Sequence, residues 1–274
     1  MPDSQTARPF ARGSFAALER KKMAAELKPD RAVVPIVRYA PSKPISELLG
    51  TGFFVGNGDV LHLVTAKHVF EGSPLNEDEK YAFVFNDGKG IAIIAISEIR
   101  VAADFDVAVC NFEKSLTPLA VSLPIARADP PLNHDVFSYE YSSTRIEKTN
   151  TGFHVSFEPH AHKGNIVRSY VSKFPEKTAT ASLLTSYPAL QGASGAPVIY
   201  GSQSKKQFAV SGMLVANSER HLLPAQVVRI DDGPEHKETT SYFLPYGKAV
   251  SWSVLAECLS GMAVPFQQVA TNEA

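Results

Sequence analysis

The sequence predicts an all-β protein built from two successive sets of short strands, with helix only at its two ends. Three observations carry this prediction. Short apolar runs recur at close spacing from Arg31 onward, turn sequences rich in glycine and aspartate separate several of them, and a stretch with paired prolines divides the series once. Many short strands of this kind are typical of β-barrels or β-sandwiches.

The chain begins with a stretch, residues 1–30, that is polar and mixed in charge. Within it, the alanine-rich and charged segment Ser14–Glu26 predicts one short helix. We interpret residues 1–30 as an extension outside the core. The stretch has no uninterrupted apolar run after a basic start, so it does not match a secretory signal.

Residues 31–125 contain the first set of predicted strands. Tight-turn sequences lie between apolar runs at Gly56-Asn57-Gly58-Asp59 and at Asn86-Asp87-Gly88. The strands expected here are Ala32–Tyr39, Gly52–Val55, Val60–Thr65, Tyr81–Phe85, Ile91–Ile99 and Ala108–Phe112. A linker follows at Ala126–Asn133, where Asp129-Pro130-Pro131 argues against a central strand.

Residues 134–246 contain the second set. Its expected strands are Asp135–Tyr139, Thr151–Phe157, Asn165–Ser172, Ala181–Ser186, Ala196–Tyr200, Phe208–Ala216 and Ser241–Leu244. The polar stretch 218–240 predicts a surface loop. Residues 247–260 predict a C-terminal helix, followed by a tail at 261–274, because a helical spacing relates Val250, Val254, Leu255 and Cys258.

The composition is that of an ordinary soluble globular protein, with 44% hydrophobic and 20% charged residues and a formal net charge of −1. The lack of a long basic cluster argues against a nucleic-acid partner, and no apolar run approaches the length of a membrane span. Cys110 and Cys258 lie in apolar runs, so we expect two buried free thiols, with a disulfide between them as the alternative. Free thiols fit a reducing compartment, and we therefore expect a cytoplasmic location.

A histidine, a carboxylate and a serine each lie beside an apolar run, in the segments Thr65-Ala66-Lys67-His68, Asp106-Val107-Ala108-Val109 and Gly192-Ala193-Ser194-Gly195-Ala196-Pro197. A serine hydroxyl becomes a strong nucleophile when a histidine removes its proton, and a carboxylate fixes the tautomer of that histidine. We therefore expect His68, Asp106 and Ser194 to converge in space. Asp104 is the alternative carboxylate, because it lies two residues before Asp106 and its side chain would point to the same side of an extended chain.

Each segment also has a purely structural interpretation. A serine between glycines is common in loops, a histidine that ends a strand is often structural, and an acid before a strand is usually a solvated turn residue. The conjunction of all three in one order favours function. The flanking glycines permit a path in which the amides of Gly192 and Ser194 point at one site, as in an oxyanion hole. The nucleophile elbow of an α/β-hydrolase is rejected, because Ala196 replaces its final glycine and the order of the three residues differs.

These segments resemble the sequence boxes of the chymotrypsin-like serine peptidases, especially their disulfide-poor bacterial members of the Deg heat-shock type. Thr51-Gly52-Phe53-Phe54-Val55 resembles the family's strand before the histidine, and Asp135-Val136-Phe137-Ser138 is similar to the first strand of its second barrel. The resemblance spans Arg31–Leu259. It implies the trypsin-like fold, in which two antiparallel six-stranded β-barrels are followed by a C-terminal helix.

The resemblance also implies roles for the reactive residues. Ser194 is the nucleophile, His68 is the general base, and Asp106 is the carboxylate that orients it. The amides of Gly192 and Ser194 hold the oxyanion.

The same resemblance implies the residues of the primary specificity pocket. Val215, Ala216 and Asn217 belong to a strand that flanks this pocket, and the backbones of Val215 and Asn217 pair with the substrate as an added strand. Pro188 lies at the floor, and Gln191 and Asn217 line the entrance. The sequence has no acid from 186 to 192, so we expect a small or medium apolar substrate side chain.

The resemblance predicts a serine endopeptidase that cleaves protein or peptide substrates through an acyl-enzyme and uses no cofactor. The alternative is a catalytically silent or partner-activated module of the same fold, with the N-terminal extension as the surface for a regulatory protein. Family members that are activated by cleavage carry an aspartate where this chain has Ala193, so that activation step is not expected. A metal site at Glu158, His160 and His162 is a weak alternative, because no partner motif accompanies them.

Overall fold

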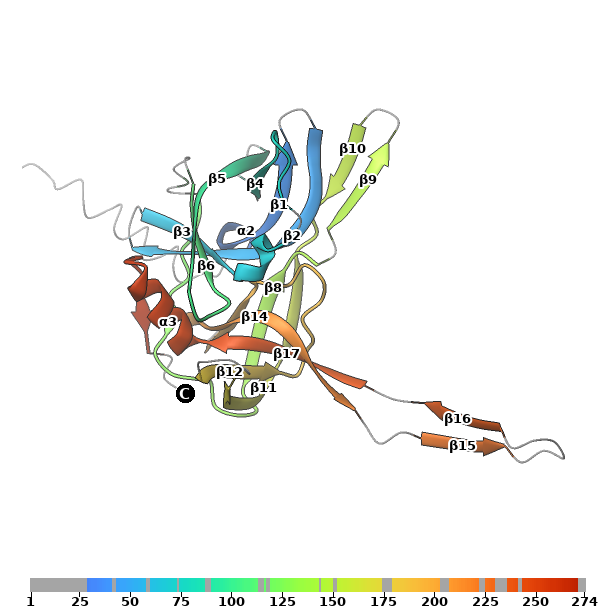
Figure 1. The fold of residues 1–274 in the computed structure, drawn as a ribbon. Helices are drawn as coiled ribbons and strands as arrows, with labels where there is room; N and C mark the ends of the chain where they lie inside the picture. The colour runs from blue at the N-terminus through green and yellow to red at the C-terminus, as the bar shows by residue number, and fades with distance from the viewer. Residues whose placement is uncertain are drawn as a thin grey trace, which may run out of the picture.

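The computed structural model describes residues 29–40, 43–57, 60–72, 74–86, 90–112, 116, 119–142, 144–149, 152–173, 179–202, 207–221, 225–229, 236–240 and 243–270. The helix expected at Ser14–Glu26 lies outside the described residues, as do the predicted turn residues Gly58, Asp59, Asp87 and Gly88 and the end of the tail, 271–274. Two β-barrels form the body of the molecule, and hairpins project from them (Figure 1).

The first barrel is closed by six antiparallel strands of the described chain. They are β1 (Val33–Ala40), β2 (Lys43–Asn57), β3 (Val60–Thr65), β4 (Lys80–Asn86), β5 (Ile91–Val101) and β6 (Ala108–Phe112). Neighbours follow the order β1-β2-β3-β6-β5-β4, and β4 pairs with β1 to close the barrel. Strand β2 is longer than the predicted Gly52–Val55, because its start pairs with the end of β1 and its end pairs with the start of β3.

The second barrel also has six antiparallel strands in the described chain. They are β8 (Asp135–Glu140), β11 (His160–Lys173), β12 (Ala179–Thr185), β13 (Pro197–Ser202), β14 (Gln207–His221) and β17 (Phe243–Ser251). The order β13-β8-β11-β12-β17-β14 closes through an additional β13–β14 pairing. The predicted fold class is therefore confirmed.

Two short strands extend the sheet of the second barrel. They are β7 (Ile125–Ala126), which pairs in parallel with β14, and β18 (Gln268–Val269), which pairs in parallel with β7. Ile125, expected at the end of the first barrel, thus belongs to the sheet of the second. Strands of two residues carry no periodicity, which explains why the sequence did not predict them.

Two further hairpins project from the barrels (Figure 1). One pairs β9 (Arg145–Thr149) with β10 (Gly152–Ser156), and the other pairs β15 (Ala225–Arg229) with β16 (His236–Thr240). The second hairpin corrects the prediction of a surface loop at 218–240, and β14 itself continues to His221, where it pairs with Phe243. Among the described strands, β15 and β16 pair only with each other, so this ribbon forms no part of either barrel.

The described residues form three short helices, α2 (Pro29–Ala32), the 3-10 turn η1 (Lys67–Phe70) and α3 (Trp252–Gly261). The C-terminal helix begins later than the predicted 247–260. Residues 247–251 instead complete β17, which pairs with β12 on one edge and β14 on the other. Pairing on both edges outweighed the helical spacing of Val250 and Val254. None of these helices has the length and apolar character needed to cross a membrane.

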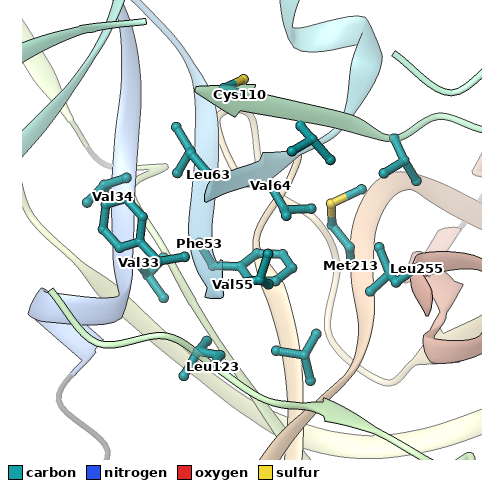
Figure 2. Packing of buried hydrophobic residues seen from close by; sticks show 14 of the residues in the cluster. Val33, Val34, Phe53, Val55, Leu63, Val64, Cys110, Leu123, Met213 and Leu255 are labelled. Atoms are coloured by element: carbon teal, nitrogen blue, oxygen red, sulfur yellow. The ribbon is translucent and has the colours of Figure 1, made fainter. Parts of the chain in front are cut away.

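One buried cluster joins the two barrels. In Figure 2, Phe53, Val55 and Val64 of the first barrel lie beside Met213 of β14 and Leu255 of α3. All five side chains are fully buried. Burying side chains of this kind stabilises the fold by roughly 1.5–3 kcal/mol each. The shared core therefore holds the two barrels, and the loops at their junction, in one fixed arrangement.

Candidate active site

His68 lies in the single turn η1, which follows the end of β3. The next residue, Val69, is 5% exposed and packs into the shared core, so it anchors this turn. Upstream, the buried Thr65 donates a hydrogen bond from Oγ1 to the backbone oxygen of Thr51 over 2.7 Å. The imidazole is therefore held by its neighbours on both sides in the chain.

Asp106 lies in the connection between β5 and β6, which a 2.9 Å hydrogen bond from the Ala102 amide to the Val107 oxygen closes. Its carboxylate contacts His68 twice. Oδ2 lies 2.7 Å from Nδ1 of the ring, and Oδ1 accepts a hydrogen bond from the His68 amide over 3.0 Å. The rival Asp104 is exposed and makes no hydrogen bond or ion pair with any residue in the described ranges.

Ser194 lies in the segment that connects β12 to β13, residues 186–196, which we call the serine loop. Its Oγ lies 2.8 Å from Nε2 of His68. Two glycines with positive φ shape the loop, Gly192 at 93° and Gly195 at 88°. A side chain at Gly195 would also collide with the backbone oxygen of Thr51 and the hydroxyl of Thr65. Backbone conformation and space therefore both require glycine there.

Electrostatics favour an ionised Asp106 beside a readily protonated His68. The hydrogen bond that the His68 ring donates to Asp106 is the largest influence on His68 and raises its pKa above 6.5, against the effect of burial. Burial is the largest influence on Asp106 and acts to raise its pKa. The hydrogen bonds from the side chain and amide of His68 outweigh it, so the pKa of Asp106 lies below 3.8. The ring that faces Ser194 is therefore a stronger base than an isolated imidazole.

Comparison with known families gives a match to the trypsin-like peptidase domain over residues 50–205. The match covers more than half of the 274-residue chain and includes His68, Asp106 and Ser194. The chain belongs to the trypsin-like peptidase family. No curated protein matches the chain.

In the serine loop of this trypsin-like domain, the amides of Gly192 and Ser194 have no acceptor among the residues that the structure describes. The Ala193 amide between them donates to the Leu190 oxygen over 2.9 Å, and the Gly195 amide donates to the Leu214 oxygen over 2.8 Å. The serine loop is thus tied on both sides of Ser194, while the two predicted oxyanion donors stay available.

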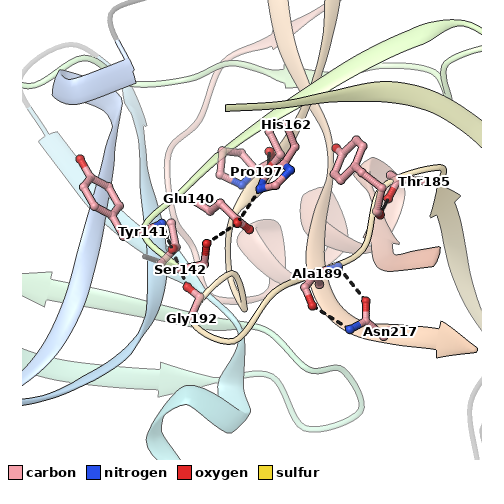
Figure 3. A network of polar contacts seen from close by, with 12 residues as sticks. Glu140, Tyr141, Ser142, His162, Thr185, Ala189, Gly192, Pro197 and Asn217 are labelled. Atoms are coloured by element: carbon pink, nitrogen blue, oxygen red, sulfur yellow. Dashed lines mark hydrogen bonds and ion pairs between the residues drawn. The ribbon is translucent and has the colours of Figure 1, made fainter. Parts of the chain in front are cut away.

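The residues predicted for the specificity pocket lie on two segments of the second barrel. Pro188 is half-buried and Gln191 is exposed, both in the serine loop, whereas Val215, Ala216 and Asn217 lie on β14. The side-chain amide of Asn217 donates to the oxygen of Ala189 and accepts from its amide, each over 2.7 Å (Figure 3). Asn217 therefore bridges the two segments instead of only lining an entrance between them.

Strand β14 has, beyond Leu214, one edge without a partner strand in the described part of the chain. It pairs with β13 as far as Met213 and with β17 from Gly212 onward. Beyond that point only β17 pairs with it among the described strands, and the register to β17 skips Val215 at a bulge. Leu214 connects this edge to the serine loop, because its amide donates to the Ala196 oxygen over 2.9 Å. An open strand edge of this kind can accept an extended peptide.

Thr51 and Ala189 belong to the site although the sequence did not single them out. The Thr51 amide donates to the Ser194 oxygen over 2.9 Å, and its Oγ1 donates to the Gly192 oxygen over 2.7 Å. The resemblance of residues 51–55 to a family strand was the only signal that pointed near Thr51. Ala189 contributes backbone groups alone, and such a contribution leaves no signal in a side-chain pattern.

Other reactive groups serve the scaffold. Nε2 of His162 lies 2.8 Å from Oε1 of the fully buried Glu140, so this histidine is engaged within the protein (Figure 3). Across the described ranges, no three His, Cys, Asp or Glu residues cluster as metal ligands would. Cys110 and Cys258 are free and buried, as predicted, and burial raises the pKa of each thiol to about 12.

Proposed function

We propose that this protein is a serine endopeptidase in which Ser194, His68 and Asp106 act as a catalytic triad. The observation that carries the proposal is the continuous line of contacts from Asp106 through His68 to Ser194, 2.7 Å and 2.8 Å long. A base that activates a serine must lie within roughly 2.6–3.2 Å of its hydroxyl and be oriented by a third group. Membership of the trypsin-like peptidase family supports the same chemistry.

The reaction begins when Nε2 of His68 takes the proton of the Ser194 hydroxyl while Oγ bonds to the scissile carbonyl carbon. The carbonyl electron pair moves to its oxygen and gives a tetrahedral oxyanion. Protonated His68 then donates its proton to the leaving amine, the C–N bond breaks, and an acyl ester remains on Ser194. Water adds to this ester while His68 takes its proton, and return of the proton to Oγ releases the carboxylic acid.

Asp106 supports both steps from the far side of the imidazole. Its Oδ2 accepts a hydrogen bond from Nδ1–H of His68, so Nε2 is the basic nitrogen that faces Ser194. The lowered pKa keeps the carboxylate ionised, and its charge stabilises the imidazolium that forms in each step. The amides of Gly192 and Ser194 donate to the oxyanion, and loss of one such donor costs about 10²–10³ in rate.

The proposed substrate is an extended polypeptide with a small residue on the acyl side of the cleaved bond. The open edge of β14 supports an extended substrate, because main-chain hydrogen bonds can add it as a strand. The bridge between Asn217 and Ala189 supports a small side chain. A long side chain that passed between these two residues would have to break both hydrogen bonds.

Reaction with a fluorophosphonate probe tests the proposal, because the probe forms a covalent bond only with an activated serine. We expect the wild-type protein to be labelled and Ser194→Ala not to be labelled. Ser169→Ala is the matched control, since Ser169 is exposed and bonds to Asp129 instead of a histidine, and this variant should be labelled like the wild type. A folded wild-type chain that resists labelling would contradict the proposal and support a catalytically silent module.

We also propose that the chain is one of the disulfide-poor, Deg-type members and functions in the cytoplasm. Its two free, buried cysteines support both statements, because free thiols persist in reducing compartments. Alkylation of the denatured but unreduced protein, taken directly from cells and followed by mass spectrometry, tests the redox state. Modification of both cysteines is expected, whereas a Cys110–Cys258 disulfide would contradict the proposal.

A further inference from the structure

We infer that Thr51 is a positioning residue that holds the amides of Gly192 and Ser194 in the arrangement that catalysis needs. The inference rests on the function proposed above. Thr51 lies on β2 of the first barrel, whereas both amides belong to the serine loop of the second. A residue of one barrel therefore controls the geometry of a loop of the other.

Thr51 holds two carbonyl groups of the serine loop. Its Oγ1 donates to the oxygen of Gly192 over 2.7 Å, and its amide donates to the oxygen of Ser194 over 2.9 Å. Gly192 and Ser194 are the same two residues whose own amides lack an acceptor in the described part of the chain. Thr51 thus holds the carbonyl groups of Gly192 and Ser194, the two residues whose amides are available to an oxyanion.

These contacts supply a restraint that the loop lacks by itself. Peptide planes are rigid, so the direction of an amide depends on the backbone dihedrals that relate its plane to the next. Gly192 has a φ of 93° and no side chain that limits its rotation. The hydrogen bond to its carbonyl keeps it in this conformation, and the bond to the Ser194 carbonyl restrains the loop beyond Ala193 in the same way.

Thr51 is itself held in place by hydrogen bonds to its backbone oxygen and to its hydroxyl. It is fully buried, and its backbone oxygen accepts a hydrogen bond from Oγ1 of Thr65 over 2.7 Å. The Tyr141 amide donates a hydrogen bond to Oγ1 of Thr51 over 3.2 Å. Because this amide occupies an acceptor position of the hydroxyl, the single hydroxyl proton is directed to the Gly192 oxygen. Because Thr65 ends the strand that leads into His68, Thr51 links the segment of the base to the loop of the nucleophile.

Close packing of the serine loop on β2 supports this role. A side chain at Gly50 would lie 2.8 Å from the Ser194 oxygen, and one at Gly195 would collide with the Thr51 oxygen. The loop thus lies against the backbone of residues 50–51, with no space for an added methyl group at either contact. The Thr51 hydroxyl acts at this interface as the donor for the Gly192 carbonyl.

Thr51→Val keeps the shape of the side chain but removes the proton donor to the Gly192 oxygen. The oxyanion exists only in the transition state and the intermediates, so a misplaced amide should affect the chemical step more than substrate binding. We expect kcat to fall about 10- to 100-fold, while KM changes by less than about threefold. Thr51→Ser retains the hydroxyl and should keep kcat within about threefold of the wild type.

Ser138 provides the matched control. It is fully buried, and its Oγ donates to the oxygen of Pro197 over 2.8 Å, just beyond the serine loop. Ser138→Ala therefore also removes one buried hydroxyl donor to a backbone carbonyl, but Ser138 makes no hydrogen bond with Gly192 or Ser194. A general loss of stability would occur in both variants, whereas only Thr51→Val should lower kcat.

The test measures kcat and KM, normalised by active-site titration, together with hydrogen–deuterium exchange of residues 186–196. Exchange in this loop should be faster in Thr51→Val than in the wild type, Thr51→Ser or Ser138→Ala. Thr51→Ala, which cannot overpack the site, replaces the valine variant if that variant does not fold.

Three results would overturn the inference: a wild-type kcat in Thr51→Val, an equal loss in Ser138→Ala, or a failure of Thr51→Ser to retain kcat. If the wild-type protein neither hydrolyses peptides nor reacts with a fluorophosphonate, the proposed function fails. In that case the exchange comparison alone decides whether Thr51 holds the loop, and unchanged exchange in Thr51→Val overturns the inference.

Discussion

At the scale of single residues, the site depends on how one carboxylate holds one imidazole. Asp106 contacts both Nδ1 and the amide of His68, so it fixes the tautomer of the ring and its rotation together. Nε2 is then left 2.8 Å from the hydroxyl of Ser194. Because Val107, next to Asp106, is fully buried, this carboxylate cannot move without disturbing the core. Orientation and basicity of His68 thus have the same origin.

The raised pKa of His68 predicts the acid limb of the pH profile. His68 must be neutral to accept the Ser194 proton, and its pKa lies above 6.5, so kcat/KM should fall as the pH drops through a midpoint above 6.5. In Asp106→Asn the hydrogen bond to the carboxylate and its charge are lost, and the midpoint should move to lower pH. Steady-state kinetics across pH measure this shift, and an equal midpoint in both proteins would contradict it.

A comparison of two neighbouring aspartates tests which carboxylate orients His68. Asp106→Asn should lower kcat by about 10⁴, because an amide in place of the carboxylate favours the wrong tautomer of the ring. Asp104→Asn is the control, since Asp104 is exposed and makes no hydrogen bond or ion pair with His68, and the kcat of this variant should stay at the wild-type level. A large loss in Asp104→Asn with little change in Asp106→Asn would reassign the role.

Residue chemistry explains which parts of the site could be predicted from the sequence. Few side chains can activate a hydroxyl, so the order of His68, Asp106 and Ser194 beside apolar runs indicated a serine site. The two aspartates Asp104 and Asp106 lie two residues apart on the same side of the chain, and the resemblance favoured Asp106; in the structure Asp106 is the one that contacts His68. Thr51 acts through a hydroxyl inside a strand, a position where threonine is ordinary.

At the scale of elements, strand β14 performs two tasks. Its first part pairs with β13 and β17 and completes the second barrel, whereas its later part pairs only with β17 among the described strands. The bulge at Val215 separates the two parts, and Asn217 lies just after the bulge, in the part that pairs only with β17 among the described strands. The two hydrogen bonds between Asn217 and Ala189 then fix the distance between β14 and the serine loop.

Asn217→Gly should broaden cleavage toward larger side chains, because it removes the bridge to Ala189. We expect the ratio of kcat/KM for leucine over alanine, on the acyl side of the cleaved bond, to rise at least about tenfold. Cleavage of a peptide library, read by mass spectrometry, measures the change. Asn133→Gly is the control, since Asn133 is exposed and has a positive φ that glycine accepts. An unchanged preference in Asn217→Gly would sink the proposal of a small substrate side chain.

Barrel strands that carry apolar runs could be predicted from the sequence, whereas most strands outside the two barrels could not. Strands such as β3 and β6 have the expected bounds, because each carries apolar residues into a barrel core. The predicted strand Thr151–Phe157 contains β10, whereas β9, β15 and β16 were not predicted. All four strands lie in two-stranded sheets outside the barrels. The start of α3 was placed too early because Val250 satisfies a helical spacing while its backbone pairs with β12 and β14.

At the scale of the whole molecule, the site exists because the two barrels share a core. His68 and Asp106 come from loops of the first barrel and Ser194 from a loop of the second. Side chains from β2, β3, β14 and α3 form one buried cluster across the junction. The barrels therefore cannot separate without exposing this cluster, and the distances in the site follow from that constraint.

Leu255→Ala should destabilise both barrels together, because Leu255 is fully buried in the shared cluster. The free energy of unfolding should fall by about 2–5 kcal/mol. Urea unfolding followed by Trp252 fluorescence and by pulsed hydrogen exchange of β2 should show one transition, shifted equally for both probes. Leu132→Ala is the control, since Leu132 is 62% exposed, and it should change the free energy of unfolding by less than about 0.5 kcal/mol. Continued protection of β2 after the Trp252 signal has changed would contradict a shared core.

Capture of the acyl-enzyme tests the central claim most directly. A short peptide p-nitrophenyl ester with alanine next to the ester is mixed with the protein, quenched in acid and examined by mass spectrometry with peptide mapping. The account predicts a mass increase equal to the acyl group on the peptide that contains Ser194, and none in Ser194→Ala. An acyl group on another residue, or ester hydrolysis by Ser194→Ala at the wild-type rate, would contradict it.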